Sequence, residues 1–167
     1  ALSIWVDSAN WDPSEADPER MSPLKIQAFA DRFLRVPAAA ADIYHWSTAA
    51  VGEPWGAHSD SLLIPWDPNA TVTILLCNLN ASYAGSVIVG YFWAKDNFTV
   101  GVLPGSNQRI MFYIDATLLG MLSGTESAWS TSNVWPKIVI STLAHEFQHM
   151  IHFYQKQVLQ GAPTGTD

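Results

Sequence analysis

The stretch that decides the fold is STLAHEFQHMIHFYQ, residues Ser141–Gln155, where three histidines and one glutamate stand inside a largely apolar run. Apolar residues recur at the i, i+3, i+4, i+7 spacing of a helix face, and this stripe continues on both sides. A proline suits the first turn of such a helix and a glycine suits its end. The pattern predicts one amphipathic helix from Pro136 to Gln160, stopped by Gly161. Its predicted core stripe is Ile140, Leu143, Phe147, Ile151, Tyr154 and Val158.

Three runs ahead of this helix are short, rich in β-branched and aromatic residues, and bounded by turn residues, which is typical of strands. A fourth such run lies near the beginning of the chain. Because the middle runs are almost continuously hydrophobic, we expect both faces of their sheet to be covered, with helices on at least one side. The predicted fold class is α+β, with a mixed β-sheet packed against the long helix. The predicted strands are Leu2–Val6, Thr71–Cys77, Ser86–Trp93 and Arg109–Asp115.

A second helix is predicted to begin near residue 22. Ser22 is a suitable N-cap and Pro23 suits the first helical position. Apolar residues then recur at helical spacing, which indicates that one face of this helix is buried. Its predicted stripe is Ile26, Phe29, Ala30 and Phe33.

Composition bounds the functions open to the chain. Its 167 residues fit one domain, and 49% hydrophobic against 14% charged residues indicate a chain that folds. The net charge of −7, with its eight Lys and Arg residues scattered, argues against a nucleic-acid partner. No apolar run approaches the ~20 residues of a membrane span. Because the chain begins at Ala1, almost directly in a strand-like run, it reads as a piece of a longer precursor.

Within the long helix, His145, Glu146 and His149 form the pattern His-Glu-x-x-His. Residues four apart lie one above the other on a helix, about 5–6 Å apart, so both imidazoles can reach one Zn²⁺ ion at distances near 2.1 Å. Glu146 lies about 100° around the helix, where it can take a proton from a zinc-activated water. The triplet predicts zinc-dependent hydrolysis of peptide bonds with Glu146 as general base. The alternative is a structural histidine pair on a partly buried helix.

The third zinc ligand is the part of the site that the sequence leaves open, because catalytic zinc normally has three protein ligands and a water. His152 continues the stripe but lies ~10 Å along the axis from His145, too far for one tetrahedral ion. We expect His152 to line a cleft or to be a buried, hydrogen-bonded histidine. Asp167 lies in a Gly- and Pro-rich tail that would hold it poorly, and Asp115 and Glu126 have no motif support.

The segment TLAHEFQHMIHF, residues 142–153, resembles the zinc helix of the gluzincin peptidases, and most closely that of the hyicolysin-type bacterial metallopeptidases. The segments SVIVGYFWAKDNF and RIMFYIDAT look like the sheet that precedes this helix, which extends the resemblance over residues 71–160. The resemblance implies a zincin-like N-terminal lobe with zinc ligands at His145 and His149 and a general base at Glu146. It also implies a secreted, cell-surface or periplasmic zinc metalloendopeptidase.

In gluzincins the third ligand is a glutamate on the next helix, and this sequence ends before such an element. The resemblance therefore implies that residues 1–167 form one catalytic lobe that stops before the ligand-bearing helix. A C-terminal fragment or a second polypeptide would complete the zinc site, and without it the isolated chain is expected to be inactive. The substrate would be a peptide or protein that pairs with an edge strand above the zinc helix.

Two other functions stay open from the sequence. One is a non-catalytic, metal-containing surface-binding module of adhesin type on a degenerate peptidase fold. In that reading Trp55 and Trp66, which lie in Pro-rich loops, stack on sugars, although core packing explains most aromatic residues. A stacking platform must be exposed in the free protein, so the exposure of each tryptophan distinguishes sugar stacking from core packing. The other is a peptidase fold that binds metal without turnover.

Overall fold

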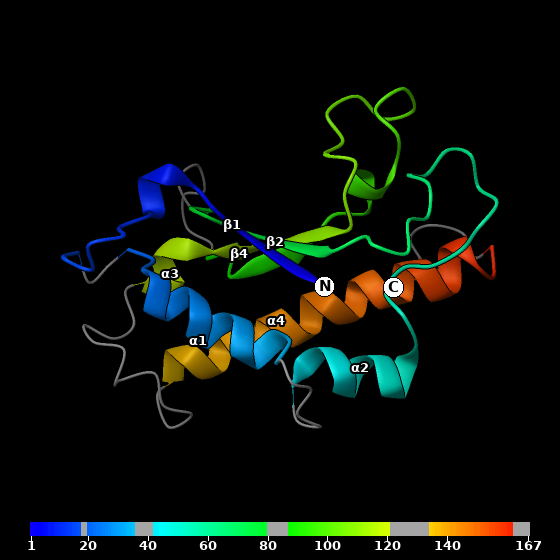
Figure 1. The fold of residues 1–167 in the computed structure, drawn as a ribbon. Coiled ribbons are helices and arrows are strands. Elements are labelled where there is room, and N and C mark those ends of the chain that lie inside the picture. Colours follow the sequence, from blue (N-terminus) through cyan, green and yellow to red (C-terminus); the bar gives the residue numbers. More distant parts are fainter. Residues whose placement is uncertain (18–19, 36–41, 80–86, 121–133, 162–167) are drawn as a thin grey trace.

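The computed structural model of the protein describes residues 1–17, 20–35, 42–79, 87–120 and 134–161 (Figure 1). Its strands are β1 (Leu2–Val6), β2 (Val72–Cys77), β3 (Gly90–Phe92) and β4 (Met111–Asp115). They form one mixed sheet in the order β1-β2-β4-β3. β2 is parallel to both of its neighbours, whereas β3 is antiparallel to β4. In the described part of the chain, β1 and β3 are therefore the edges of the sheet.

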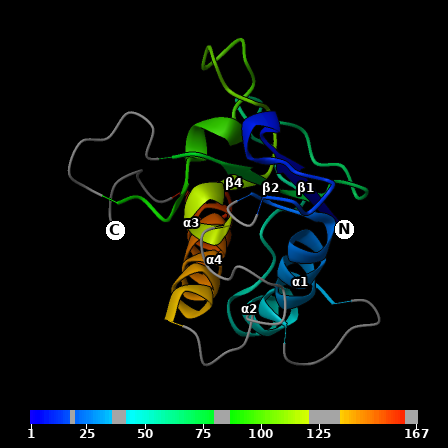
Figure 2. The same cartoon turned by 90° about the vertical axis from the view of Figure 1, so that its left-hand side faces the viewer.

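The helices are α1 (Pro23–Phe33), α2 (Ile43–Val51), α3 (Ala116–Gly120) and α4 (Val134–His152), which continues into the π-helical turn η4 (Phe153–Val158). Figures 1 and 2 show α1, α2 and α4 together on one face of the sheet. Between these layers lies an aromatic core, in which the ring of Phe147 is 4.9 Å from that of Phe33 and 6.5 Å from that of Phe112. Burying one such side chain contributes ~1.5–3 kcal/mol. This core fixes the orientation of α4 against the sheet.

Local capping explains where α1 and α2 begin. Ser22 caps α1 as predicted, since its Oγ accepts the Lys25 N–H at 3.3 Å. Asp42 caps α2, because its carboxylate accepts the His45 N–H at 2.8 Å and the Arg35 N–H at 3.0 Å. Burial alone would raise the pKa of Asp42, but these hydrogen bonds and the His45 imidazole bring the pKa below its ordinary value of 3.8. Both helices therefore have a defined start against the core.

The long helix follows its prediction up to its last turns. It begins at Val134 and its helical backbone ends at Val158, but the final six residues form a π-helix. This wider turn ties the loop after α2 to the end of the helix: Gln155 Nε2 donates to the Glu53 carbonyl and the Tyr154 hydroxyl to the Ala57 carbonyl, each at 3.0 Å. Short π-helical turns occur often at functional sites.

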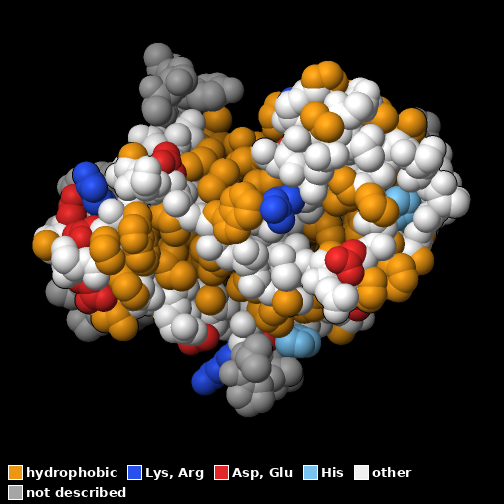
Figure 3. Space-filling view, turned by 45° about the horizontal axis from the view of Figure 1, so that its top comes forward, with side chains coloured by type: hydrophobic (Ala, Val, Ile, Leu, Met, Phe, Trp, Pro, Cys, Tyr) orange, Lys and Arg blue, Asp and Glu red, His pale blue; other side chains and the backbone are white. Residues whose placement is uncertain are grey.

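The α+β class, the mixed sheet and the long helix are as predicted, but β3 is shorter than the sequence indicated and begins at Gly90. The expectation that both sheet faces are covered holds for β4, whose five residues point alternately to the two faces and are all buried. The edge strand β1 is less covered. On the face away from the helices, Trp5 of β1 is 43% exposed, with the Arg109 guanidinium 4.5 Å from its ring centroid, whereas Tyr113 of β4 is buried. Figure 3 shows hydrophobic side chains gathered on the side that carries this face. Across the described ranges, no helix combines the length and apolarity needed to cross a membrane.

Candidate metal centre

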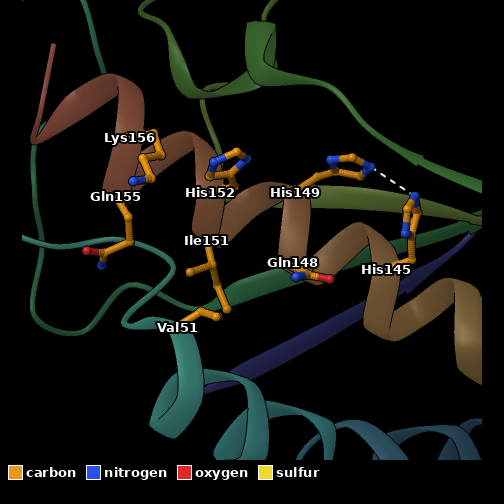
Figure 4. A pocket seen from close by; sticks show the side chains of 8 residues that line it. All are labelled: Val51, His145, Gln148, His149, Ile151, His152, Gln155 and Lys156. Atoms are coloured by element: carbon orange, nitrogen blue, oxygen red, sulfur yellow. Dashed lines mark hydrogen bonds between the residues drawn. The ribbon is translucent and has the colours of Figure 1, made fainter. Parts of the chain in front are cut away.

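α4 brings the two predicted zinc ligands together. The Nε2 atoms of His145 and His149 lie 2.9 Å apart, and the rings meet edge to face with centroids 4.4 Å apart (Figure 4). Their spacing of four residues places both on one side of the helix, where His145 is exposed and His149 half-buried. At this distance one nitrogen donates a proton to the other, so the pair converges on a single point.

The histidine pair fits a zinc ion in donor type and direction. Two Zn–N bonds of 2.0–2.1 Å at a tetrahedral angle separate the nitrogens by ~3.3 Å. The observed 2.9 Å is a few tenths of an ångström shorter, so a small ring rotation is enough. A cation would then take the place of the shared proton.

Glu146 lies on the neighbouring side of α4 and is only 7% exposed. Its Oε2 accepts the backbone N–H of Phe92 at 2.8 Å, a bond that joins α4 to the edge strand β3. Glu146 and His145 also line a common cleft between α4 and β3. The carboxylate is therefore held in place by the sheet and opens to the same space as one predicted ligand.

Gly90 permits this close approach of β3 to α4. A Cβ atom there would lie 2.8 Å from the Tyr113 carbonyl oxygen and 2.9 Å from Thr142 Cγ2, both closer than real Cβ contacts. Neither Gly90 nor the Phe92 N–H was predicted from the sequence to belong to the site. A lone glycine inside a strand-like run is the signal that could have found the first, because it often marks a close backbone approach. The Phe92 contact left no sequence signal.

A pocket of about 450 Å³ lies on the other side of the histidines, between α4, η4 and the end of α2 (Figure 4). α4 contributes His145, His149 and His152 to it, and α2 contributes Val51. His152 is exposed and lines this pocket, which agrees with the expectation that it faces a cleft. The pocket and the β3 cleft share His145, so both open toward the predicted metal position.

The other carboxylates considered as third ligand do not join this site. Asp115 is buried and caps α3, since it accepts the Leu118 N–H at 2.6 Å and the Leu79 N–H at 2.8 Å. Glu126 and Asp167 lie outside the described residues. Within the described ranges, no group of three His, Cys, Asp or Glu residues could hold a metal ion. The described part of the chain therefore brings two candidate ligands together.

Exposure separates the two tryptophans considered as sugar platforms. Trp55 is only 8% exposed and stacks over Phe153, with centroids 6.5 Å apart, so its assignment as a platform is wrong. Trp66 is 49% exposed and meets the exposure criterion. One exposed tryptophan does not distinguish a sugar-binding module from an ordinary surface.

Comparison with known proteins gives the class of the chain. Residues 1–167 match the family described as peptidase M30, and the chain belongs to that family. This agrees with the hyicolysin-type resemblance of the long helix. A curated relative, the neutral metalloprotease ShpI of Staphylococcus hyicus, is 35% identical over 119 residues, which cover 70% of this chain and 24% of the relative. No solved structure matches the chain.

Proposed function

We propose that this protein is a zinc-dependent metalloendopeptidase, with His145 and His149 as zinc ligands and Glu146 as general base. The observation that carries the proposal is the convergence of the two histidine Nε2 atoms, 2.9 Å apart, beside a carboxylate held by β3. Membership of the peptidase M30 family supports the same chemistry. The name of the relative, a neutral metalloprotease, supports a metal-dependent peptidase in particular.

The proposed roles follow from the positions of the side chains. Zinc bound at the histidines would lower the pKa of a water toward 7 and polarise a peptide carbonyl. Glu146 would be the group that takes a proton from this water and passes it to the leaving amine. The Phe92 N–H holds one carboxylate oxygen, which leaves the carboxylate oriented toward the cleft shared with His145. The chain thus supplies both the ligands and a positioned base.

We propose β3 as the strand along which the substrate lies. It is a sheet edge, and it borders the cleft that contains Glu146. Residues of an antiparallel strand alternate in the direction of their backbone hydrogen-bonding groups, and Phe92 points its N–H away from β4. By this alternation Gly90 also presents its backbone outward. An extended peptide or protein segment can pair there as an added strand.

The zincin-like character of the lobe and its completion are parts of the same proposal. We expect residues 1–167 to act as one catalytic lobe, with the third zinc ligand, a glutamate, supplied by a segment after Asp167 or by a second polypeptide. The match to 24% of the relative leaves room for such a segment in a protein of that kind. Export to the cell surface, periplasm or medium remains the expected location.

The test compares Glu146→Gln with His149→Ala. Zinc content is measured by elemental analysis after gel filtration, with the intact mass recorded on the same sample. Hydrolysis of fluorogenic peptides is measured for the chain alone and for the chain with its C-terminal segment. Glu146→Gln should keep zinc and lose hydrolysis by a factor of about 10²–10⁴. His149→Ala should lose zinc and hydrolysis together.

Two results would contradict the proposal. If His149→Ala retains the zinc of the unmodified chain, the metal is bound elsewhere. If zinc is bound and Glu146→Gln leaves hydrolysis unchanged, Glu146 is not the base. Zinc binding without any hydrolysis, even with the C-terminal segment present, would favour the metal-binding fold without turnover.

A further inference from the structure

We propose that the pocket on the α2 side of α4 binds an acidic side chain of the substrate and that Lys156 is the residue that selects it. This inference rests on the proposed function and concerns which peptides the site accepts. The pocket begins at His145 and His149 and extends along α4 to η4 (Figure 4). Its volume of about 450 Å³ lies within the range typical of ligand sites.

The charge of this pocket is opposite to that of the chain. None of the eight described residues that line it is Asp or Glu, although the chain carries a net charge of −7. Lys156 lines its far end and is exposed. Its Nζ donates to Gln160 Oε1 at 3.4 Å, and no carboxylate in the described part of the chain forms an ion pair with it. An incoming carboxylate can therefore bind this ammonium group without displacing an existing ion pair.

The walls of the pocket suit an acidic side chain on a short apolar stem. Val51 from α2 and Ile151 from α4 supply apolar surface, while Gln148 supplies an amide group. Asp and Glu side chains combine methylene groups with a terminal carboxylate in the same way. A phosphate or other compact anion would leave the apolar wall without a partner, so the pocket favours the amino-acid side chain.

The wall formed by α2 is fixed in place. Gly52 adopts φ +101°, and a Cβ atom there would lie 2.7 Å from Gln155 Nε2. The same nitrogen donates to the Glu53 carbonyl at 3.0 Å. The end of α2 is thus packed directly on η4, and Figure 4 shows Val51 beside Ile151 of α4.

The position of Lys156 sets the register of the acidic residue. Lys156 follows His149 by seven residues, which corresponds to ~10 Å along a helix axis. An extended peptide advances ~3.3 Å per residue. A carboxylate bound at Lys156 therefore belongs to a residue about three positions from the bond that lies at the histidines.

The test is a binding measurement that does not depend on hydrolysis. Two fluorescein-labelled decapeptides of alanine and glycine, one with a central glutamate and one with glutamine in its place, are titrated with the Glu146→Gln chain at low salt. Fluorescence anisotropy gives Kd for each. The glutamate peptide should bind about threefold more tightly, as expected for an exposed ion pair. Lys156→Gln should abolish this preference and Lys156→Glu should reverse it.

Lys95→Glu is the matched control, because it makes the same charge change at a lysine that does not line the pocket and lies over Trp93 instead. It should keep the preference for glutamate. Equal Kd values for the two peptides, no binding of either, or a preference that survives Lys156→Glu would each overturn the inference. Selective binding by a chain that never hydrolyses peptides would reject the proposed function alone, and hydrolysis without selectivity would reject the acidic subsite alone.

Discussion

On its β3 flank, α4 lies so close to the sheet that a methyl group at Gly90 would come within 2.9 Å of Thr142 Cγ2, whereas on its α2 flank it borders a pocket of about 450 Å³. Glu146 belongs to the first flank, where it is buried and bonded to the Phe92 N–H. His149, which is half-buried, and His152, which is exposed, belong to the second flank.

The comparison of the two flanks shows which parts of the proposed site the fold holds in position without a metal. The proposed base is held by a backbone group of another element, so its position is fixed before any ligand arrives. The two proposed ligands, His145 and His149, contact each other at 2.9 Å and can rotate apart toward a metal. A rigid base beside adjustable ligands is expected where the metal itself completes the geometry.

The largest loss of stability is expected from disrupting the aromatic core on which both flanks of α4 depend. Phe147→Ala leaves a cavity among Phe33, Tyr44 and Phe112 and should lower the free energy of unfolding by ~3–5 kcal/mol. Urea denaturation measures it. The neighbouring exposed position provides the control: Gln148→Ala should change stability by no more than ~0.5 kcal/mol. Equal losses in the two variants would show that the aromatic core does not anchor α4.

A smaller effect should fall on the β3 flank alone. Gly90→Ala forces β3 and α4 apart, because its new methyl group meets Thr142 of α4 as well as the Tyr113 carbonyl of β4, and should lower stability by ~1–3 kcal/mol. Proton transfer by Glu146 should weaken as well, so peptide hydrolysis should fall while zinc content is unchanged. Gly101→Ala is the control, since no atom lies within 4 Å of the added group. If both variants behave alike, the close contact is not needed.

The smallest predicted change in stability concerns the capping of α2 and depends on pH. The pKa of Asp42 is lowered in the fold, against the effect of its burial, so its ionised cap stabilises α2 above pH 3.8 and this contribution is lost as pH falls through the lowered pKa. Asp42→Asn keeps a capping side chain but does not titrate. The stability difference between the unmodified chain and Asp42→Asn should therefore be largest near pH 7 and shrink toward pH 2. Thermal unfolding across this range measures it, and a difference independent of pH would contradict it.

Features set by local sequence were predicted well. The stripe residues Leu143, Phe147 and Ile151 are buried, and Ser22 caps α1, because helical periodicity and capping depend on neighbours within a few residues. The predicted N-terminal end of β3 was wrong, since Val87 is β-branched like a typical strand residue but is 66% exposed. A β-branched side chain does not by itself distinguish a residue that pairs with a neighbouring strand from one that lies just before the strand begins.

Features set by distant contacts could not be predicted. The bond from Phe92 to Glu146 spans 54 residues, and it depends on the strand order, which placed β3 rather than β2 beside α4. The change from α- to π-helix after His152 likewise coincides with a long-range contact, the bond from Gln155 to the Glu53 carbonyl in the loop after α2. The histidine pair was predictable because its geometry lies within one helix, whereas the setting of Glu146 depends on the whole sheet.

The bond between Glu146 and the edge strand has a consequence for kinetics. If a substrate pairs with β3, the strand that receives it is also the strand that holds the proton acceptor. A substrate seated one residue out of register displaces the strand backbone and the carboxylate with it. Such a molecule can be retained by its many backbone contacts and still react slowly. Discrimination among substrates would then appear in kcat, at the moment of bond cleavage, more than in KM.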